Sequence, residues 1–424
     1  MTTILALTVG GSCAPIVTAV RDYRPDLVCF IASGGPRGSR VTVDGPGRPC
    51  RGTTEDAPSI VAQLGLSAQQ YRVVEVPDPD AFPEIYASCR NALRELMEEF
   101  PGAHCIADYT GGSKTMSVGL VLAALECGWQ LSLVRGQRPD LVRVADGTEL
   151  AGLVNAWEVR ARQLLEEARR LFNDYAYASA GALLEGLVQQ SPLPPDLDRT
   201  VRVWVAYCRG FDAWDRFDHA RAVQILATLP GEGVPWPFLK ALAGRTHATG
   251  YEAVLDLVRN AERRAARGRY DDAVARLYRA CELLAQVRLG QREPPLDTNN
   301  LDLERLPPDL RPRYEKMREL NEMRGWGPEV KLGLMEDYLL LADLDDPLGR
   351  VFRPLENRLR EALHRRNHSI LAHGGEPLDE AGYQEMRAVV GELVEKGLAT
   401  LGVRISAPQF PLLGPQGLCP RGEE

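Results

Sequence analysis

The sequence lacks the features that mark a metalloprotein, a membrane protein or a uniformly basic nucleic-acid-binding protein. Its nine cysteines are scattered, and no two have the Cys-x-x-Cys spacing of a zinc site or a redox motif. The longest apolar run, residues 116–125, is far shorter than the roughly 18 residues that cross a bilayer. With 50 basic against 58 acidic side chains, the formal net charge is −8. That balance excludes a wholly basic surface but not a local basic patch.

These absences predict a cytoplasmic protein. The first fifteen residues, MTTILALTVGGSCAP, have no basic stretch and only a short apolar run, so we expect no signal peptide. An odd number of scattered cysteines then predicts reduced thiols. We expect no metal, no cofactor and no contact with a membrane. The 424 residues predict two to three domains at about 150 residues each.

Residues 1–150 alternate short β-like runs with helical stretches. The strand candidates are Thr3–Thr8, Leu27–Ala32, His104–Asp108 and Trp129–Val134. This alternation predicts a parallel sheet with helices on both faces, which is an α/β, Rossmann-like domain. The segment Arg37–Ala57, rich in Gly, Pro and Arg, is predicted to be a surface loop.

The remaining sequence has an almost purely helical pattern, so we predict an all-α C-terminal half. We divide it into a helical connecting segment, residues 151–250, and a second domain, residues 251–424. Long amphipathic helices are expected around 252–289 and 354–373. The last fifteen residues, which are rich in Pro and Gly, are expected to form a loose tail.

Glycine-rich segments follow three of the predicted strands. They are Gly10-Gly11-Ser12, Ser33-Gly34-Gly35 and Thr110-Gly111-Gly112-Ser113-Lys114. Ligands of open parallel sheets bind beyond the carboxyl ends of the strands, where backbone N–H groups attract anions. The third segment adds hydroxyl groups and the cation of Lys114, although it is not a Walker A loop. The alternative is that these glycines only make tight turns.

The string Asp108-Tyr109-Thr110-Gly111-Gly112-Ser113-Lys114, after a strand and before an apolar helix, resembles the second signature of CARF domains, the sensor domains of CRISPR-associated proteins. The end of the first strand matches the place of the first signature. The resemblance covers roughly residues 1–145 and implies a homodimer that binds a cyclic oligoadenylate, either tetra- or hexa-adenylate, across its two-fold axis. It also implies a set of ligand contacts: Gly10, Gly11, Ser12, Thr110, Gly111, Gly112 and Lys114. Asp108 is as well explained as a turn residue.

Three of the six histidines fall within ten residues, in EALHRRNHSILAHGG. A helix over 354–373 would place Arg366 and His373 on one face, about 10.5 Å apart along the axis. Leu363, Ser369 and Ile370 would share that face. The alternative is a packed histidine and a snorkelling arginine. His364 and His368 fall on other faces, and we expect them to be solvated.

The string from Arg366 to His373 resembles the Arg-x(4–6)-His motif of HEPN ribonucleases, including the frequent Asn after the Arg, here Asn367. Behind a CARF-like domain, it resembles the CARF–HEPN ribonucleases of type III CRISPR systems. The resemblance implies a single-strand-specific, metal-independent endoribonuclease, activated by the cyclic oligoadenylate, whose composite site forms at a dimer interface. Arg366 and His373 would carry the cleavage and Asn367 would assist, leaving 2′,3′-cyclic phosphate and 5′-hydroxyl ends.

Basic side chains surround this motif. Five arginines face two glutamates in 351–373, and seven arginines face three acids in 259–279. They could form a local RNA track, although a solvated helix face is the commoner meaning of such a run.

Three alternatives stay open at this point. One is a non-catalytic regulator that senses the ligand and binds a partner or DNA through its helices, although no helix-turn-helix is evident. Another is a metal-dependent nuclease, although no Asp…Glu-x-Lys arrangement is evident. The third adds to the endoribonuclease interpretation: slow cleavage of the cyclic ligand by the sensor domain itself.

Overall fold

The computed structural model describes residues 2–52, 55–135, 150–154, 157–190, 193–230, 232–371, 374–415 and 417–421. The chain divides into two compact units. The N-terminal unit comprises residues 1–164 and 186–199, and the C-terminal unit comprises residues 165–185 and 200–424. The first is an α/β unit and the second is almost wholly helical, as the sequence predicted.

The N-terminal unit is built on a six-stranded sheet in the order β3-β2-β1-β4-β5-β6. The strands are β1 (Thr3–Val9), β2 (Leu27–Ser33), β3 (Tyr71–Val76), β4 (His104–Asp108), β5 (Gln130–Arg135) and β6 (Leu150–Val154). The first five are parallel, and β6 pairs antiparallel with β5. The chain winds outward from β1 on one side and from β4 on the other, so the topological switch point lies between these two strands.

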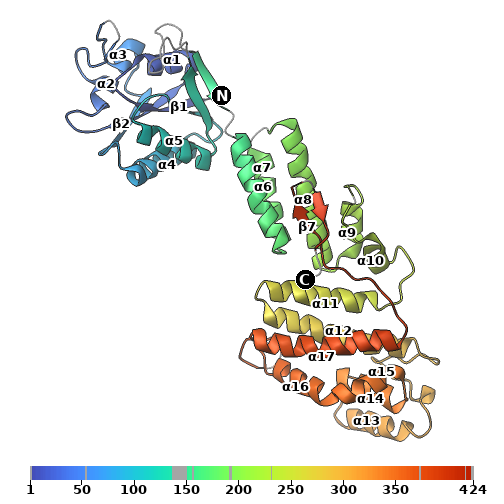
Figure 1. Cartoon of the computed structure of the whole chain (residues 1–424). Helices are drawn as coiled ribbons and strands as arrows, with labels where there is room; N and C mark the ends of the chain where they lie inside the picture. The colour runs from blue at the N-terminus through green and yellow to red at the C-terminus, as the bar shows by residue number, and fades with distance from the viewer. Residues whose placement is uncertain are drawn as a thin grey trace. The chain divides into compact units, whose positions relative to one another are not determined.

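Helices cover both faces of this sheet (Figure 1). They are α1 (Ala14–Tyr23), α2 (Arg40–Asp44), α3 (Ile60–Leu64), α4 (Phe82–Glu99) and α5 (Lys114–Cys127). A hydrophobic core lies on each face of the sheet, and successive apolar residues of β1 point alternately into one core and the other. Ile4 and Ala6 pack with α4 and α5, whereas Leu5 and Leu7 pack with α1, α2 and α3. This period of two follows from the pleat of a strand that is buried on both faces.

Two details differ from the sequence-based expectations. The segment Arg37–Ala57 is not only a surface loop, because it contains α2, whose Val43 is buried. In addition, a disulfide joins Cys13 to Cys50, where we expected reduced thiols. The backbone N–H of Arg51 donates to the carbonyl of Gly11 (3.2 Å), which holds this segment against the end of β1. The two cysteines thereby come within 5.6 Å between Cα atoms, a separation at which a disulfide forms.

The chain after β6, most of which lies in the C-terminal unit, consists of helices and one short hairpin. Its elements are α6 (Trp157–Asn173), α7 (Tyr177–Gln190), α8 (Pro195–Asp215), α9 (His219–Leu226), α10 (Trp236–Leu242), α11 (Glu252–Ala266), α12 (Tyr270–Gly290), α13 (Arg311–Met323), α14 (Leu334–Asp343), α15 (Pro347–Phe352), α16 (Glu356–Asn367), α17 (Glu380–Thr400), β7 (Leu412–Gly414) and β8 (Gly417–Cys419). The predicted helix around 252–289 is therefore two helices, α11 and α12, joined at Gly268, whose φ of +68° suits glycine. None of the helices that the structure describes is both long and apolar enough to span a bilayer.

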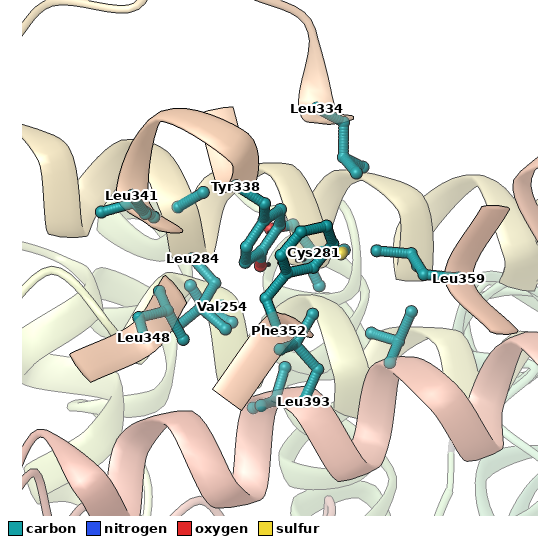
Figure 2. Packing of buried hydrophobic residues seen from close by; sticks show 14 of the residues in the cluster. Val254, Cys281, Leu284, Leu334, Tyr338, Leu341, Leu348, Phe352, Leu359 and Leu393 are labelled. Atoms are coloured by element: carbon teal, nitrogen blue, oxygen red, sulfur yellow. Dashed lines mark hydrogen bonds between the residues drawn. The ribbon is translucent and has the colours of Figure 1, made fainter. Parts of the chain in front are cut away.

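The main core of this unit lies among α11, α12 and α14 to α17 (Figure 2). Tyr338 of α14 and Phe352 of α15 stack at its centre, with ring centroids 5.0 Å apart. The Tyr338 hydroxyl donates to the carbonyl of Cys281 on α12 (2.8 Å), so the one polar atom of this aromatic pair is satisfied. The resulting core fixes α12 as the helix against which α14, α16 and α17 pack.

The residues after α17 do not form the loose tail that the sequence predicted. Phe410 is buried and lies among the aromatic rings of Tyr177, Phe211 and Trp214, at centroid distances of 5.9, 5.1 and 4.7 Å. Leu413 is also buried, and its backbone N–H donates to Asn173 Oδ1 on α6 (2.7 Å). Burial of these apolar side chains holds the segment in place although its Pro and Gly content resembles that of a free tail.

A buried ionic network joins α8 to α11. Asp215 accepts hydrogen bonds from Arg263 Nε (2.8 Å), Arg264 Nη2 (2.5 Å) and Asn260 Nδ2 (3.0 Å). The side chain of Arg263 is only 1% exposed, and its guanidinium also lies 3.7 Å above the ring of Phe410. Arg263 and Arg264 are therefore not available to bind RNA, because both pair with Asp215. The basic run in residues 259–279 is interrupted at these positions.

Asp337 of α14 is a buried acid without a partner. It is fully buried, and neither carboxylate oxygen has a hydrogen bond among the described residues. Burial, together with the nearby carboxylates of Glu282 and Glu336, raises the pKa of Asp337 to about 8. The folded protein therefore holds this group protonated at pH 7, whereas the unfolded chain ionises it near pH 3.8.

We expect Asp337 to make the C-terminal unit less stable as the pH rises. Between about pH 4 and 8 the folded state binds a proton that the unfolded state releases, so the free energy of unfolding falls across this window. Asp337→Asn should flatten that slope and raise the free energy of unfolding at pH 8 by about 2 kcal/mol. Chemical unfolding at several pH values measures both effects.

Asp345→Asn is the matched control, because Asp345 is exposed and paired with Arg350. It should leave the slope between pH 4 and 8 unchanged. An Asp337→Asn protein with the wild-type slope would show that Asp337 does not hold this proton.

Candidate functional site

The loops that follow β1 and β4 meet at the switch point of the sheet. The backbone of Gly10 approaches that of Gly112 so closely that a Cβ on Gly10 would lie 3.1 Å from the Gly112 nitrogen. A Cβ on Gly111 would lie 2.3 Å from the Thr8 carbonyl oxygen, and the Thr8 hydroxyl donates to the Gly111 carbonyl (2.6 Å). Glycine is needed at these positions because the two strand ends leave no room for a side chain.

Hydrogen bonds to Asp108, the last residue of β4, fix the loop that follows this strand. The Asp108 carboxylate accepts hydrogen bonds from the Thr110 backbone N–H (3.0 Å) and from the Ser132 hydroxyl on β5 (2.7 Å). Burial raises the pKa of Asp108 above its usual range, and these hydrogen bonds oppose that effect. The Thr110 hydroxyl accepts from the Val134 backbone N–H (2.8 Å). Asp108 is thus the turn residue that the sequence allowed for.

Ser12 and Lys114 are the exposed polar side chains beside these loops. Lys114 is the first residue of α5, and no described carboxylate lies within ion-pair distance of it. Ser113 caps the same helix by accepting from the Met116 N–H (3.1 Å). The structure therefore brings the residues predicted as ligand contacts to one edge of the sheet: Gly10, Gly11, Ser12, Thr110, Gly111, Gly112 and Lys114.

The second glycine-rich segment, Ser33-Gly34-Gly35, is less suited to an anion. A Cβ on Gly34 would lie 2.3 Å from Glu75 Oε1, so a carboxylate stands beside this loop. The Ser33 and Ser39 side chains bond to each other and to each other's backbone N–H groups, which closes the loop on itself. These two observations leave the β1 and β4 loops as the candidate ligand site of the N-terminal unit.

The second candidate site is at the end of α16, and its geometry differs from the prediction. The helix ends at Asn367 instead of running to residue 373 as predicted. Ser369 instead forms a bridge with Glu376, and a Cβ on Gly374 would lie 1.6 Å from the His368 carbonyl oxygen. These contacts turn the chain back after the helix, which the apolar period alone does not reveal.

Other expectations for this segment are met in part. His373 lies outside the described residues. His364 and His368 are exposed as predicted, with ring centroids 4.3 Å apart. Ile370, which we expected on the buried stripe, is 54% exposed because the helix has already ended.

Arg366 is held at this helix end without an acidic partner. Its guanidinium carbon lies 4.4 Å from the centroid of the Tyr278 ring on α12, and its Nη1 donates to Asn367 Oδ1 (3.1 Å). No described carboxylate lies within ion-pair distance of it. The sequence pattern did not reveal this contact between Tyr278 and Arg366.

The other arginines around the motif are all neutralised. Arg358 pairs with Glu392 (2.6 Å) and Arg365 with Glu385 (2.9 Å). Arg353 and Arg360 share Glu356, at 3.2 and 2.9 Å. The basic residues of 351–371 therefore do not form a continuous positive surface for RNA. Arg366 is the described arginine among them that has no acidic partner. No group of three or more His, Cys, Asp or Glu side chains suited to a metal ion occurs in the part of the chain that the structure describes.

Comparisons with known proteins bear on both sites. The Csm6 6H domain model matches residues 161–263, and the Csm6 HEPN domain model matches residues 243–396. The CRISPR system endoribonuclease Csm6 of Thermus thermophilus is 27% identical over 384 residues, covering 76% of this chain and 79% of that protein.

The fold is also found in a solved structure, Enterococcus italicus Csm6 bound to cyclic hexa-2′-fluoro-hexa-dAMP. It superposes with a TM-score of 0.62 at 14% identity and covers 95% of each chain. The two domain models of one family together span residues 161–396, more than half of this chain. The Rossmann-like unit, the helical half and these matches agree, and the chain belongs to the Csm6 family of CRISPR-associated proteins, with the 6H and HEPN domains of that family.

Proposed function

We propose that this protein is a metal-independent endoribonuclease of CRISPR defence that cleaves single-stranded RNA when its N-terminal unit binds a cyclic oligoadenylate. The observation that carries the proposal is the setting of Arg366, an arginine in the HEPN domain that contacts the Tyr278 ring and Asn367 and has no described carboxylate within ion-pair distance. Arginine paired with a carboxylate has its in-plane donors occupied, whereas Arg366 keeps donors for a phosphate.

The chemistry follows from these residues. A 2′-hydroxyl attacks the adjacent phosphorus, the 5′-oxygen leaves, and a 2′,3′-cyclic phosphate forms. Arg366 would stabilise the charge that develops on the phosphate oxygens. His373, placed in the motif by sequence, would transfer the proton between oxygens near neutral pH. Asn367 accepts from Arg366 and would keep the guanidinium in register with the phosphate.

We expect cleavage of a fluorescent single-stranded RNA, in the presence of chelator, only when cyclic tetra- or hexa-adenylate is added. Arg366→Ala and His373→Ala should each lower the rate by at least about 100-fold, because one removes the charge on the phosphate and the other the proton carrier. Arg365→Ala is the matched control, since Arg365 is next in sequence and already paired with Glu385.

A protein that binds a cyclic oligoadenylate but cleaves no RNA would instead be a ligand-dependent regulator. Loss of cleavage in chelator would indicate a metal-dependent nuclease. Analysis of the cyclic ligand after the same incubation tests whether the N-terminal unit also cleaves it.

The edge formed by the β1 and β4 loops would hold the cyclic oligoadenylate. Gly11 and Ser12 are exposed at this edge, and Lys114 adds a cation that no described carboxylate compensates. Phosphodiester groups suit such an edge because both the backbone dipoles and Lys114 attract negative charge.

Lys114→Ala should weaken binding of the cyclic oligoadenylate about tenfold or more, which corresponds to the loss of one charged hydrogen bond. Isothermal titration calorimetry with each ring size measures it. The control is Arg72→Ala, which removes a cation on β3 that is already paired with Glu99 of α4. This variant should bind the ligand normally. Equal affinity for Lys114→Ala and the wild type would remove Lys114 from the ligand site.

The N-terminal unit also carries an apolar face that a second copy would cover. Helix α5 is apolar on nearly all sides, although Val118 is 51% and Leu122 is 44% exposed. Phe82 on the neighbouring α4 is also exposed. A helix that is apolar all round is normally buried, so this face fits a partner. A second copy would place two identical ligand edges in one assembly, as a cyclic ligand with rotational symmetry requires.

We expect a homodimer in sedimentation velocity. Leu122→Glu should raise its dissociation constant at least about tenfold, because the substitution places a charge in an apolar interface. Val41→Glu, an exposed position on α2 that packs on the opposite face of the sheet, serves as the control. An unchanged dissociation constant for Leu122→Glu would show that α5 is not in the interface.

A further inference from the structure

The contact between Arg366 and Tyr278 joins two helices of the C-terminal unit at the candidate catalytic site. Arg366 is in the last turn of α16, and Tyr278 is on α12. The guanidinium carbon lies 4.4 Å from the ring centroid, well within the distance at which the negative face of an aromatic ring attracts a cation. Arg366 is the cation that this ring holds.

An aromatic ring holds an arginine differently from a carboxylate. A carboxylate accepts the in-plane N–H groups and cancels the charge, as at Arg358 with Glu392 and Arg365 with Glu385. A ring contacts the flat face of the guanidinium, so its N–H groups keep pointing outward in the plane. The contact with Tyr278 therefore restrains Arg366 while leaving it able to bind a phosphate.

Helix α12 gives the ring a rigid support. Leu277, the residue before Tyr278, and Cys281, about one turn after it, are fully buried in the main core. Tyr278 itself is half-buried, and its hydroxyl has no hydrogen bond among the described residues. The ring face, and not the hydroxyl, is thus the part of Tyr278 that contacts the site.

We propose that Tyr278 is a positioning residue for RNA cleavage, whose ring face fixes the Arg366 guanidinium for the phosphate without neutralising it. This inference rests on the proposed function. Without the ring, the long side chain of Arg366 would leave the helix end in many rotamers, and fewer of them would meet the phosphate.

The test is the single-turnover rate of RNA cleavage, with the protein in saturating excess over the RNA and with saturating activator, for variants at position 278. Tyr278→Leu should lower the rate about tenfold, and Tyr278→Phe should keep it within about twofold of wild type. Tyr270→Leu is the matched control. Tyr270 is on the same helix about 12 Å earlier, half-buried, and packs on Tyr383 (6.0 Å) instead of an arginine.

Two further measurements separate positioning from simple packing. In an Arg366→Ala background, Tyr278→Leu should lower the residual rate no further, because the ring acts through Arg366. Replacing Tyr278 by phenylalanines with one to five ring fluorines should lower the rate stepwise, because fluorine weakens the ring's attraction for a cation while the ring keeps nearly the same size. The fluorinated series remains informative if Tyr278→Leu does not fold.

Each contrary result has a definite meaning. A Tyr278→Phe rate as low as that of Tyr278→Leu, or a flat fluorine series, would overturn the ring-face role. If Arg366→Ala is inactive while Tyr278→Leu cleaves normally, this inference fails and the proposed function stands. If Arg366→Ala cleaves normally, the proposed function fails as well.

Discussion

The pairing of Asp215 with Arg263 is the interaction on which the C-terminal unit depends. Arg263 is buried, and a buried guanidinium without a carboxylate is strongly destabilising. The same guanidinium contacts Gln409 and Phe410, so one ion pair between α8 and α11 also determines where the segment after α17 lies. Asp215 and Arg263 both fall within the part matched by the 6H domain model, and Arg263 also lies within the HEPN match.

The same rule of charge compensation distinguishes the catalytic candidate from its neighbours. Inside the unit, arginines are paired because burial demands it; on the surface around α16, they are paired with glutamates of the same or the next helix. Exposed pairs of this kind contribute little stability, but they cancel charge locally. Against this background Arg366 stands out as an arginine restrained by neutral groups. Because Arg353, Arg358, Arg360 and Arg365 are compensated, Arg366 is the described arginine of residues 351–371 whose charge is available for a phosphate.

The sequence allowed much of this to be predicted where the signal is local. Short β-like runs between helical stretches identified four strands of the sheet, and glycines identified the loops that meet at its switch point. It did not identify β3, where Arg72 and Glu75 interrupt the apolar pattern. It also missed β6 (Leu150–Val154), which falls at the start of the segment predicted to be helical. It also placed the end of α16 too late, since the bridge between Ser369 and Glu376 that turns the chain is a contact between residues the helical period does not relate. Phe410 was assigned to a tail because nothing beside it in sequence shows the aromatic rings that bury it.

These differences follow from how each site is built. The ligand edge is built from backbone: its glycines are needed because Gly10 approaches Gly112, and Gly111 approaches Thr8, so the sequence itself records the geometry. The site at α16 is built from side chains. An Arg followed by a His indicates the catalytic groups, but it does not indicate which residues position the arginine. Tyr278 lies 88 positions before Arg366 and has the spacing of an ordinary core residue. Its contact with the guanidinium arises only when α12 and α16 pack together, so a sequence motif can name the charged group but not the aromatic ring that restrains it.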